Sequence, residues 1–185
     1  MSLAADSTWS VVAPERSPVH GGRHYPSVRY SASAVEYKGE LVVTHGYFYN
    51  HAVRHPAWQS DAWAFSFGSS KWRKLHEGEM HGAPSARYSA SAVLYDDALW
   101  MYGGDDGGHK TSMFNYVFQA WFTEMWRFDL RTYVWHKVEY QSPCPSKRHL
   151  LSHLLSSSGK GLQLFTRMQR TFRRVLLSLG SPQDA

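Results

Sequence analysis

The sequence predicts an all-β protein assembled from repeated four-stranded antiparallel sheets. Three observations lead to this expectation: an internal duplication, a high aromatic content, and short β-branched and aromatic runs separated by turn residues. Of the 185 residues 15% are aromatic, including 8 Trp, 11 Tyr and 9 Phe. Aromatic side chains pack well on a pleated surface and lose rotamer freedom in a helix. An all-helical fold is therefore not expected.

The duplication is clearest over one ten-residue segment. Pro26–Val35 returns as Pro84–Val93 with nine of ten residues identical, at an offset of 58 that still holds between Gly46 and Gly104. Beyond these glycines the two copies align at an offset of 63, so the second copy carries five extra residues there. An insertion confined to one place between two matching segments indicates a loop, where added length costs little.

Each copy is predicted to form four strands. In the first copy these strands cover about residues 28–37, 40–46, 61–67 and 71–76.

Two-residue turns are expected between the first and second strands. Lys38-Gly39 has glycine where a positive φ is needed, and Asp96-Asp97 occupies the same place in the second copy. After the second strand the first copy has His45-Gly46, where the second has a pair of glycines. Because histidine does not adopt a glycine conformation cheaply, a different turn is expected at His45.

Sheets repeated at this period are typical of a β-propeller, in which they pack face to face around an axis. Small side chains alternate in the first strand of each copy, Ser31–Ala34 and Ser89–Ala92, which suits the crowded strand nearest the axis. A β-sandwich with a chance duplication is the alternative. The predicted division is an N-terminal segment 1–25 with the outer strand of a preceding blade, repeats 26–83 and 84–144, the first strand of a third blade at 145–155, and a basic tail 156–185.

The order of the marker residues resembles the kelch repeat, most clearly over residues 84–139. These markers, which we expect to be structural, are Arg29, Gly46, Trp72, Arg87, Gly103, Gly104, Trp126 and Trp135. The resemblance implies a partial kelch-type propeller with about two complete blades. It also implies a non-catalytic protein–protein interaction module of the scaffold or adaptor type. A fragment of a propeller enzyme or of a carbohydrate-binding propeller is the alternative.

The partner is expected to bind at one rim of the blades. Because the chain reverses at every turn, the long loops 46–60 and 103–123 open at the same end of their sheets. Both are rich in the residue types that dominate interface hot spots. The candidate partner-binding residues are Tyr47, Tyr49, Arg54, Trp58, His109, Phe114, Tyr116 and Trp121. Alternatively, these aromatic side chains fold over their own loop or the neighbouring blade.

Other classes of function find little support. His45, His51, His55 and His109 lack the spacing of a metal site, so no metal and no cofactor are expected. There is no Gly-x-Ser-x-Gly segment, and Cys144 is the single cysteine, so no catalysis is predicted. Neither a signal peptide nor an 18-residue apolar run is visible, which favours a cytoplasmic protein.

The positive charge lies mostly in the tail. The formal net charge is +5, of which residues 156–185 carry +4 from five basic residues and one acidic residue, so no nucleic-acid partner is expected for the body. Apolar residues between Leu164 and Leu179 recur at three- and four-residue steps, which predicts an amphipathic helix or else a disordered tail.

The number of blades is a constraint as well. Propellers close with about four to eight blades, and two complete copies are fewer than that. We therefore expect missing blades or other chains to complete the ring.

Overall fold

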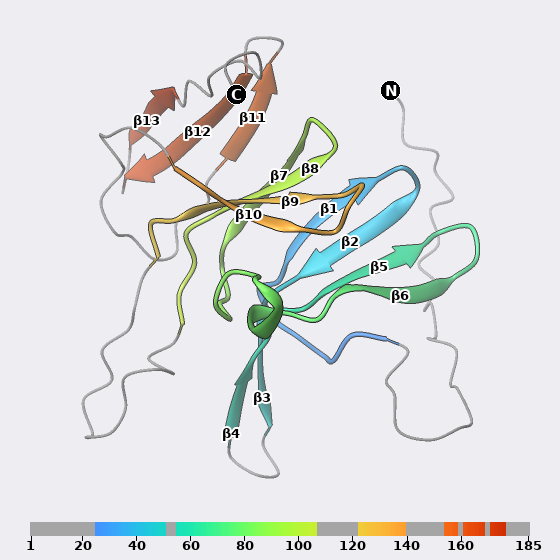
Figure 1. Ribbon diagram of the computed structural model, residues 1–185. Coiled ribbons are helices and arrows are strands. Elements are labelled where there is room, and N and C mark those ends of the chain that lie inside the picture. Colours follow the sequence, from blue (N-terminus) through green and yellow to red (C-terminus); the bar gives the residue numbers. More distant parts are fainter. Residues whose placement is uncertain are drawn as a thin grey trace, which may run out of the picture.

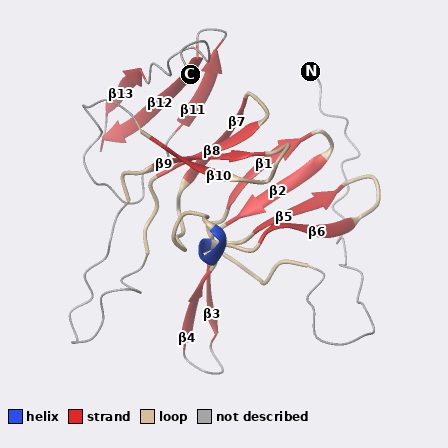
Figure 2. Cartoon of the chain, in the orientation of Figure 1, coloured by secondary structure: helices blue, strands red, loops and turns tan. Residues whose placement is uncertain are grey.

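The computed structural model describes residues 25–50, 55–106, 122–139, 154–158, 161–168 and 171–176. This part of the chain consists of strands and turns with one short 3-10 helix, η1 (Glu79–His81) (Figure 2). None of its helices is long and apolar enough to cross a membrane.

Two four-stranded antiparallel sheets form the body (Figure 1). The first, here called the first blade, has the order β1-β2-β5-β6. Its strands are β1 (Ser33–Tyr37), β2 (Glu40–Thr44), β5 (Ala62–Ser66) and β6 (Lys71–His76). The second blade repeats this order with β7 (Ser91–Tyr95), β8 (Ala98–Tyr102), β9 (Met125–Asp129) and β10 (Trp135–Val138). Separate sheets from the two copies confirm the predicted all-β fold.

The predicted hairpin turns are confirmed by the backbone angles. Lys38 and Gly39 have φ values of 51° and 80°, and Asp96 and Asp97 have 49° and 50°. Two successive positive φ angles are the signature of a type I′ turn, whose twist matches that of the flanking strands. Asp tolerates this region better than most residues, which explains why the second turn needs no glycine.

The main core lies between the two blades. Val42, Ala62 and Ala64 of the first blade belong to one buried cluster with Leu99, Met101 and Phe128 of the second. β1 lies against β7 at the inner edge. There the Ser33 hydroxyl donates to the Ala90 carbonyl at 2.9 Å, and the Ser89 amide donates to the Ser31 carbonyl at 3.0 Å. Small side chains allow this close approach of two backbones.

The long loop of the first blade contains a hairpin that the sequence did not predict. β3 (Tyr47–Asn50) pairs with β4 (His55–Trp58), and the hairpin projects away from the blade (Figure 1). The Gln59 amide closes its base on the Gly46 carbonyl at 2.9 Å. The pattern escaped sequence analysis because Pro56 and the short strands argue against a sheet. Pro is nevertheless tolerated here, since β4 is an edge strand.

A third sheet replaces the predicted C-terminal helix or disordered tail. It has the order β11-β12-β13, formed by β11 (Leu154–Ser158), β12 (Gly161–Met168) and β13 (Thr171–Leu176). The helical expectation was wrong because three- and four-residue apolar spacing also occurs in hairpins, and a helix depends on packing more than on its own pattern. β11 lies against β7 and so continues the series of sheets. Of the predicted strand 145–155, residues 145–153 lie outside the described residues.

The turn at His45 also differs from expectation. His45 has a φ of 61° and Gly46 of 103°, close to the 74° and 97° of Gly103 and Gly104. The first copy therefore makes the same left-handed turn as the second. A Cβ on Gly104 would stand 3.0 Å from the Tyr88 carbonyl oxygen, so the second position needs glycine for space as well as for its angle.

Contacts of the imidazole compensate for the left-handed backbone of His45. The side chain is buried, its Nε2 donates to the Pro84 carbonyl at 3.2 Å, and its Nδ1 lies 2.8 Å from the Thr44 hydroxyl oxygen. The ring also meets the indole of Trp135 edge-on, with 5.6 Å between ring centroids. Burial, together with the positive charge of Arg87, lowers the pKa of His45 to about 3. His45 is therefore neutral in the folded chain.

This buried histidine predicts a loss of stability in acid. The unfolded chain binds a proton at His45 near pH 6.5 and the folded chain only near pH 3, so its stabilising contribution is complete above pH 6.5 and is lost as the pH falls between these values. His45→Gly should flatten the dependence of the free energy of unfolding on pH by about 1.4 kcal/mol per pH unit between pH 6 and 4. Urea titrations at several pH values measure it.

Ser70→Gly is the control for the backbone effect, since Ser70 also has a positive φ, of 56°. Unlike His45, Ser70 is exposed, and its replacement removes no ionisable group. Parallel pH profiles for the parent chain and His45→Gly would contradict the prediction.

Candidate functional site

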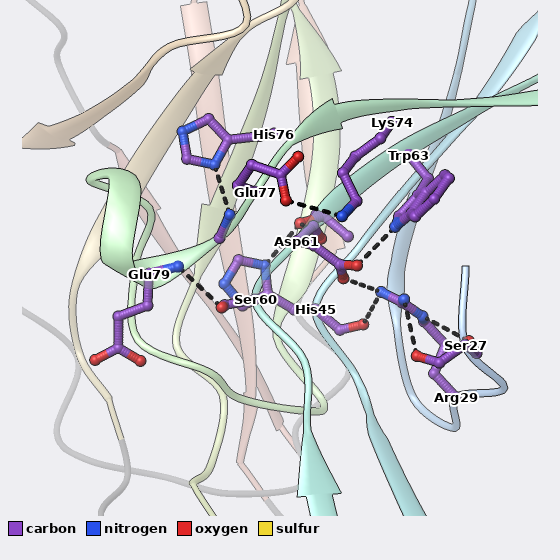
Figure 3. A network of polar contacts seen from close by, with 12 residues as sticks. Ser27, Arg29, His45, Ser60, Asp61, Trp63, Lys74, His76, Glu77 and Glu79 are labelled. Atoms are coloured by element: carbon purple, nitrogen blue, oxygen red, sulfur yellow. Dashed lines mark hydrogen bonds and ion pairs between the residues drawn. The ribbon is translucent and has the colours of Figure 1, made fainter. Parts of the chain in front are cut away.

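The long loops open at one edge of the blades, here called the loop rim, and each is fastened by a buried arginine. In the first blade Arg29 Nη1 donates to the His45 carbonyl at 3.1 Å and to Asp61 Oδ1 at 2.8 Å (Figure 3). His45 directly precedes loop 46–60 and Asp61 directly follows it. One guanidinium thus holds both stems of the loop, and we call this contact set the stem clamp.

The second blade repeats the stem clamp around its longer loop. Arg87 Nη1 donates to the Gly103 carbonyl at 3.0 Å, and Nη2 donates to Glu124 Oε2 at 3.1 Å. The Arg87 side chain is 0% exposed. The clamp is therefore preserved although the two loops differ in length by five residues.

Neighbouring repeat residues orient each arginine. The serine two positions before each arginine accepts two hydrogen bonds from it, one at its carbonyl from Nε and one at its hydroxyl from Nη2. For Arg29 the acceptor is Ser27, at 3.1 and 3.3 Å. For Arg87 the acceptor is Ser85, at 2.9 and 3.1 Å.

The carboxylate of each clamp is held by a tryptophan. Trp63 Nε1 donates to Asp61 at 2.6 Å, and Trp126 Nε1 donates to Glu124 at 3.1 Å. Sequence analysis missed Asp61 and Glu124, although an acidic residue two positions before an aligned tryptophan in both copies was a usable signal.

Arg87 and Glu124 of the second stem clamp stabilise each other's charged forms. Burial lowers the pKa of Arg87, while its hydrogen bond and ion pair with Glu124 act in the opposite direction. Burial alone would raise the pKa of Glu124, but hydrogen bonds from Lys137, Trp126 and Arg87 outweigh it and lower that pKa to about 2. The guanidinium also lies 3.7 Å from the centroid of the Phe122 ring, a favourable cation–π distance.

An aromatic group lies at the base of the β3–β4 hairpin. The tyrosine cluster, as we name it, consists of Tyr30, Tyr47, Trp58 and Tyr88. The ring centroid of Tyr47 lies 6.4 Å from that of Tyr30, 5.7 Å from Trp58 and 5.6 Å from Tyr88. Tyr30 remains 57% exposed. Burial and then the negative charge of Asp105 raise the pKa of Tyr88.

The predicted partner-binding residues divide into two groups. Tyr47 and Tyr49 lie on β3 and Trp58 ends β4, so the hairpin presents three of them together. The remaining five lie outside the described residues: Arg54, His109, Phe114, Tyr116 and Trp121. Packing of Tyr47 against Trp58 agrees with the alternative that loop aromatics cover their own loop. Tyr30 and Tyr88 were missed, although both stand in the duplicated ten-residue segment.

The predicted structural markers all lie within the described part of the chain. The Trp72 ring lies tilted against that of Phe65 with 5.1 Å between centroids, and the Trp135 ring stacks on that of Phe128 at 4.7 Å. Among the described residues, no three His, Cys, Asp or Glu side chains gather as a metal site would require.

The stem clamp predicts that Arg87→Lys is strongly destabilising. A lysine ammonium cannot form the planar fork that reaches Gly103, Ser85 and Glu124 together, so buried acceptors lose their donors. We expect the free energy of unfolding to fall by about 2–4 kcal/mol, measured by urea denaturation. Arg73→Lys is the control: Arg73 pairs with Glu40 at 2.6 Å, but its side chain is 45% exposed. That change should cost less than about 1 kcal/mol, and equal losses would contradict the clamp.

Comparison with known proteins agrees with this architecture. A solved structure described as "Structure of YjhT" is similar with a TM-score of 0.50 at 12% sequence identity, covering 78% of this chain and 35% of that chain. This chain therefore spans about a third of the length of that protein. No curated protein matches the sequence. The family model of the KLHDC2/KLHL20/DRC7 Kelch-repeats domain matches residues 4–171. A match over nearly the whole chain, together with the repeated four-stranded blades, shows that this chain belongs to the kelch-repeat family.

Proposed function

We propose that this chain is a non-catalytic interaction module, of the scaffold or adaptor type, that binds a protein partner through its loop rim. The observation that carries the proposal is the stem clamp. It fixes both ends of two long loops on a rigid sheet, which is how proteins present variable binding segments. A cytoplasmic location is part of the proposal.

The described surface of the loop rim has the chemistry of a protein interface. Tyrosine and tryptophan combine a large apolar area with a polar atom, and they lose few rotamers on binding. Tyr47 and Trp58 support each other through ring contacts, while Tyr30 beside them exposes more than half of its surface. Such a cluster is partly ordered before the partner arrives, which lowers the entropic cost of association.

Variants at the loop rim test the proposal. Tyr30→Ala should weaken partner binding at least about tenfold, because it removes the exposed ring without touching the stem clamp. Affinity capture with the full chain, followed by mass spectrometry and titration of each specific partner, measures the loss. Thermal unfolding of each variant verifies that the fold is unchanged.

The matched control lies at the opposite rim. Arg131→Ala removes an exposed side chain that pairs with Asp97 there, at 3.7 Å, so it should leave partner binding unchanged. Equal binding by the parent chain and Tyr30→Ala would count against the loop rim. Binding to a glycan array but to no protein would favour the carbohydrate-binding alternative instead.

A further inference from the structure

The three tyrosines of the tyrosine cluster have no basic side chain of the described residues over their rings. Two other tyrosines of the blades do. Lys38 Nζ lies 4.7 Å from the ring centroid of Tyr37, and Arg73 Cζ lies 5.2 Å from that of Tyr133. A positive charge over an aromatic face is attracted by the quadrupole of the ring. The tyrosine cluster therefore offers rings for a cation that the described part of the chain does not itself supply.

The rings of the cluster can be reached from solvent. Tyr30 is 57% exposed, and Tyr47 and Tyr88 are half-buried. The ring planes of Tyr30 and Tyr88 are tilted by 45° and 41° against that of Tyr47, so neither ring is stacked flat on it. A planar group can therefore lie on the Tyr30 ring without separating the cluster.

Main-chain hydrogen bonds fix the tyrosines before any ligand binds. The Tyr30 amide donates to the Tyr47 carbonyl at 2.6 Å, and the Tyr47 amide donates to the Tyr30 carbonyl at 3.0 Å. Tyr88 exchanges the same pair of bonds with Asp105, at 3.0 Å in each direction. The residue that directly follows the left-handed turn is thus a ring in the first copy and a carboxylate in the second. Groups that are already ordered lose little freedom on binding.

Negative charge lies beside these rings. The Tyr88 hydroxyl donates a hydrogen bond to the Asp105 carboxylate. The described residues around the second stem clamp supply four carboxylates against two cations, namely Glu79, Asp105, Asp106 and Glu124 against Arg87 and Lys137. Arg87 and Lys137 both pair with Glu124. This excess of carboxylates attracts a cation to the cluster and disfavours an anion.

We propose that the tyrosine cluster binds an arginine side chain of the protein partner, with the guanidinium group lying on the Tyr30 ring. This inference rests on the proposed function, because it names the group that the loop rim recognises. A guanidinium is planar, stacks on aromatic faces and stays charged at every physiological pH. It is also more weakly hydrated than an ammonium group, which lowers the cost of bringing it onto a ring. The rings supply the contact surface, and the carboxylates beside Tyr88 supply the opposite charge.

An arginine peptide and its neutral analogue test this chemistry directly. The probes are acetyl-Gly-Ser-Arg-Ser-Gly-amide and the same peptide with citrulline, whose side chain is planar and similar in shape but uncharged. Each is titrated into the full 185-residue chain labelled with carbon-13 in its tyrosine rings, and NMR follows the ring signals. We expect the arginine peptide to shift the Tyr30 signals and to bind at least about threefold more tightly than the citrulline peptide. Equal affinities, or no binding of either peptide at about 10 mM, would overturn the inference.

Substitutions at position 30 separate a cation–π contact from a merely apolar one. Tyr30→Phe keeps an aromatic face and should retain the preference for arginine, whereas Tyr30→Leu keeps apolar bulk and should lose it. The remaining tyrosine signals report the affinity in both variants. Phe67→Leu is the matched control, because the Phe67 ring is 55% exposed at the opposite rim and its loss should change neither affinity. A preference for arginine that persists in Tyr30→Leu would assign the cation to another part of the chain and refute the inference.

Failure of this inference can be told apart from failure of the proposed function. If Tyr30→Ala weakens binding of a captured partner but the cluster shows no preference for arginine, the loop rim remains the interface and only the arginine contact is refuted. If the preference for arginine holds but Tyr30→Ala leaves partner binding unchanged, the proposed function is refuted, and with it the role of the cation in partner recognition.

Discussion

Two buried guanidinium groups hold together the loop rim of this protein. Each arginine donates to the carbonyl just before a long loop and to the carboxylate just after it, at 3.1 and 2.8 Å for Arg29 and at 3.0 and 3.1 Å for Arg87. Burying a cation is expensive unless every donor finds a partner. The serine two positions earlier and the carboxylate held by the tryptophan supply those partners. This explains why serine, carboxylate and tryptophan recur together with the arginine in both copies. The contact set therefore joins the two stems of each loop just beyond the last pair of the ladder between the second and third strands.

Much of the fold could be predicted from the sequence because the same strand and turn pattern occurs in both copies of the repeat. The ten-residue duplication, the turns at Lys38-Gly39 and Asp96-Asp97, and the tryptophan of the fourth strand each depend on local chemistry that composition reveals. The predictions were wrong where contacts between residues far apart in the sequence determine the local conformation. His45 keeps a left-handed backbone because Pro84 and Trp135, far away in sequence, hold its ring. The segments 161–168 and 171–176 form strands because neighbouring strands pair with them, although their apolar spacing also fits a helix.

The candidate site was harder to predict than the fold. Aromatic composition identified the loop that contains Tyr47 and Trp58, and the structure places these residues in one hairpin. Composition could not show that Tyr30 and Tyr88 join them, since both belong to the duplicated segment and not to a long loop. Tyr30 contacts Tyr47 from 17 positions away in the sequence, and Tyr88 contacts it from the other blade. Equivalent residues of the two copies can differ in exposure, and only the three-dimensional structure shows which of them reaches the surface. The exposure of Tyr30 is such a case, because its counterpart Tyr88 is half-buried.

The stem clamp has a consequence for how such a protein can change. Because one side chain fixes the distance between the two ends of a loop, the sheet beneath is insensitive to what the loop contains. The second copy carries five additional residues between the same two contacts and still builds the same four strands. The loop sequence can therefore vary without changing the four strands beneath it. The same property makes the loop positions beyond Gly46 and Gly104 suitable places to insert foreign sequences, while the two glycines themselves stay unchanged.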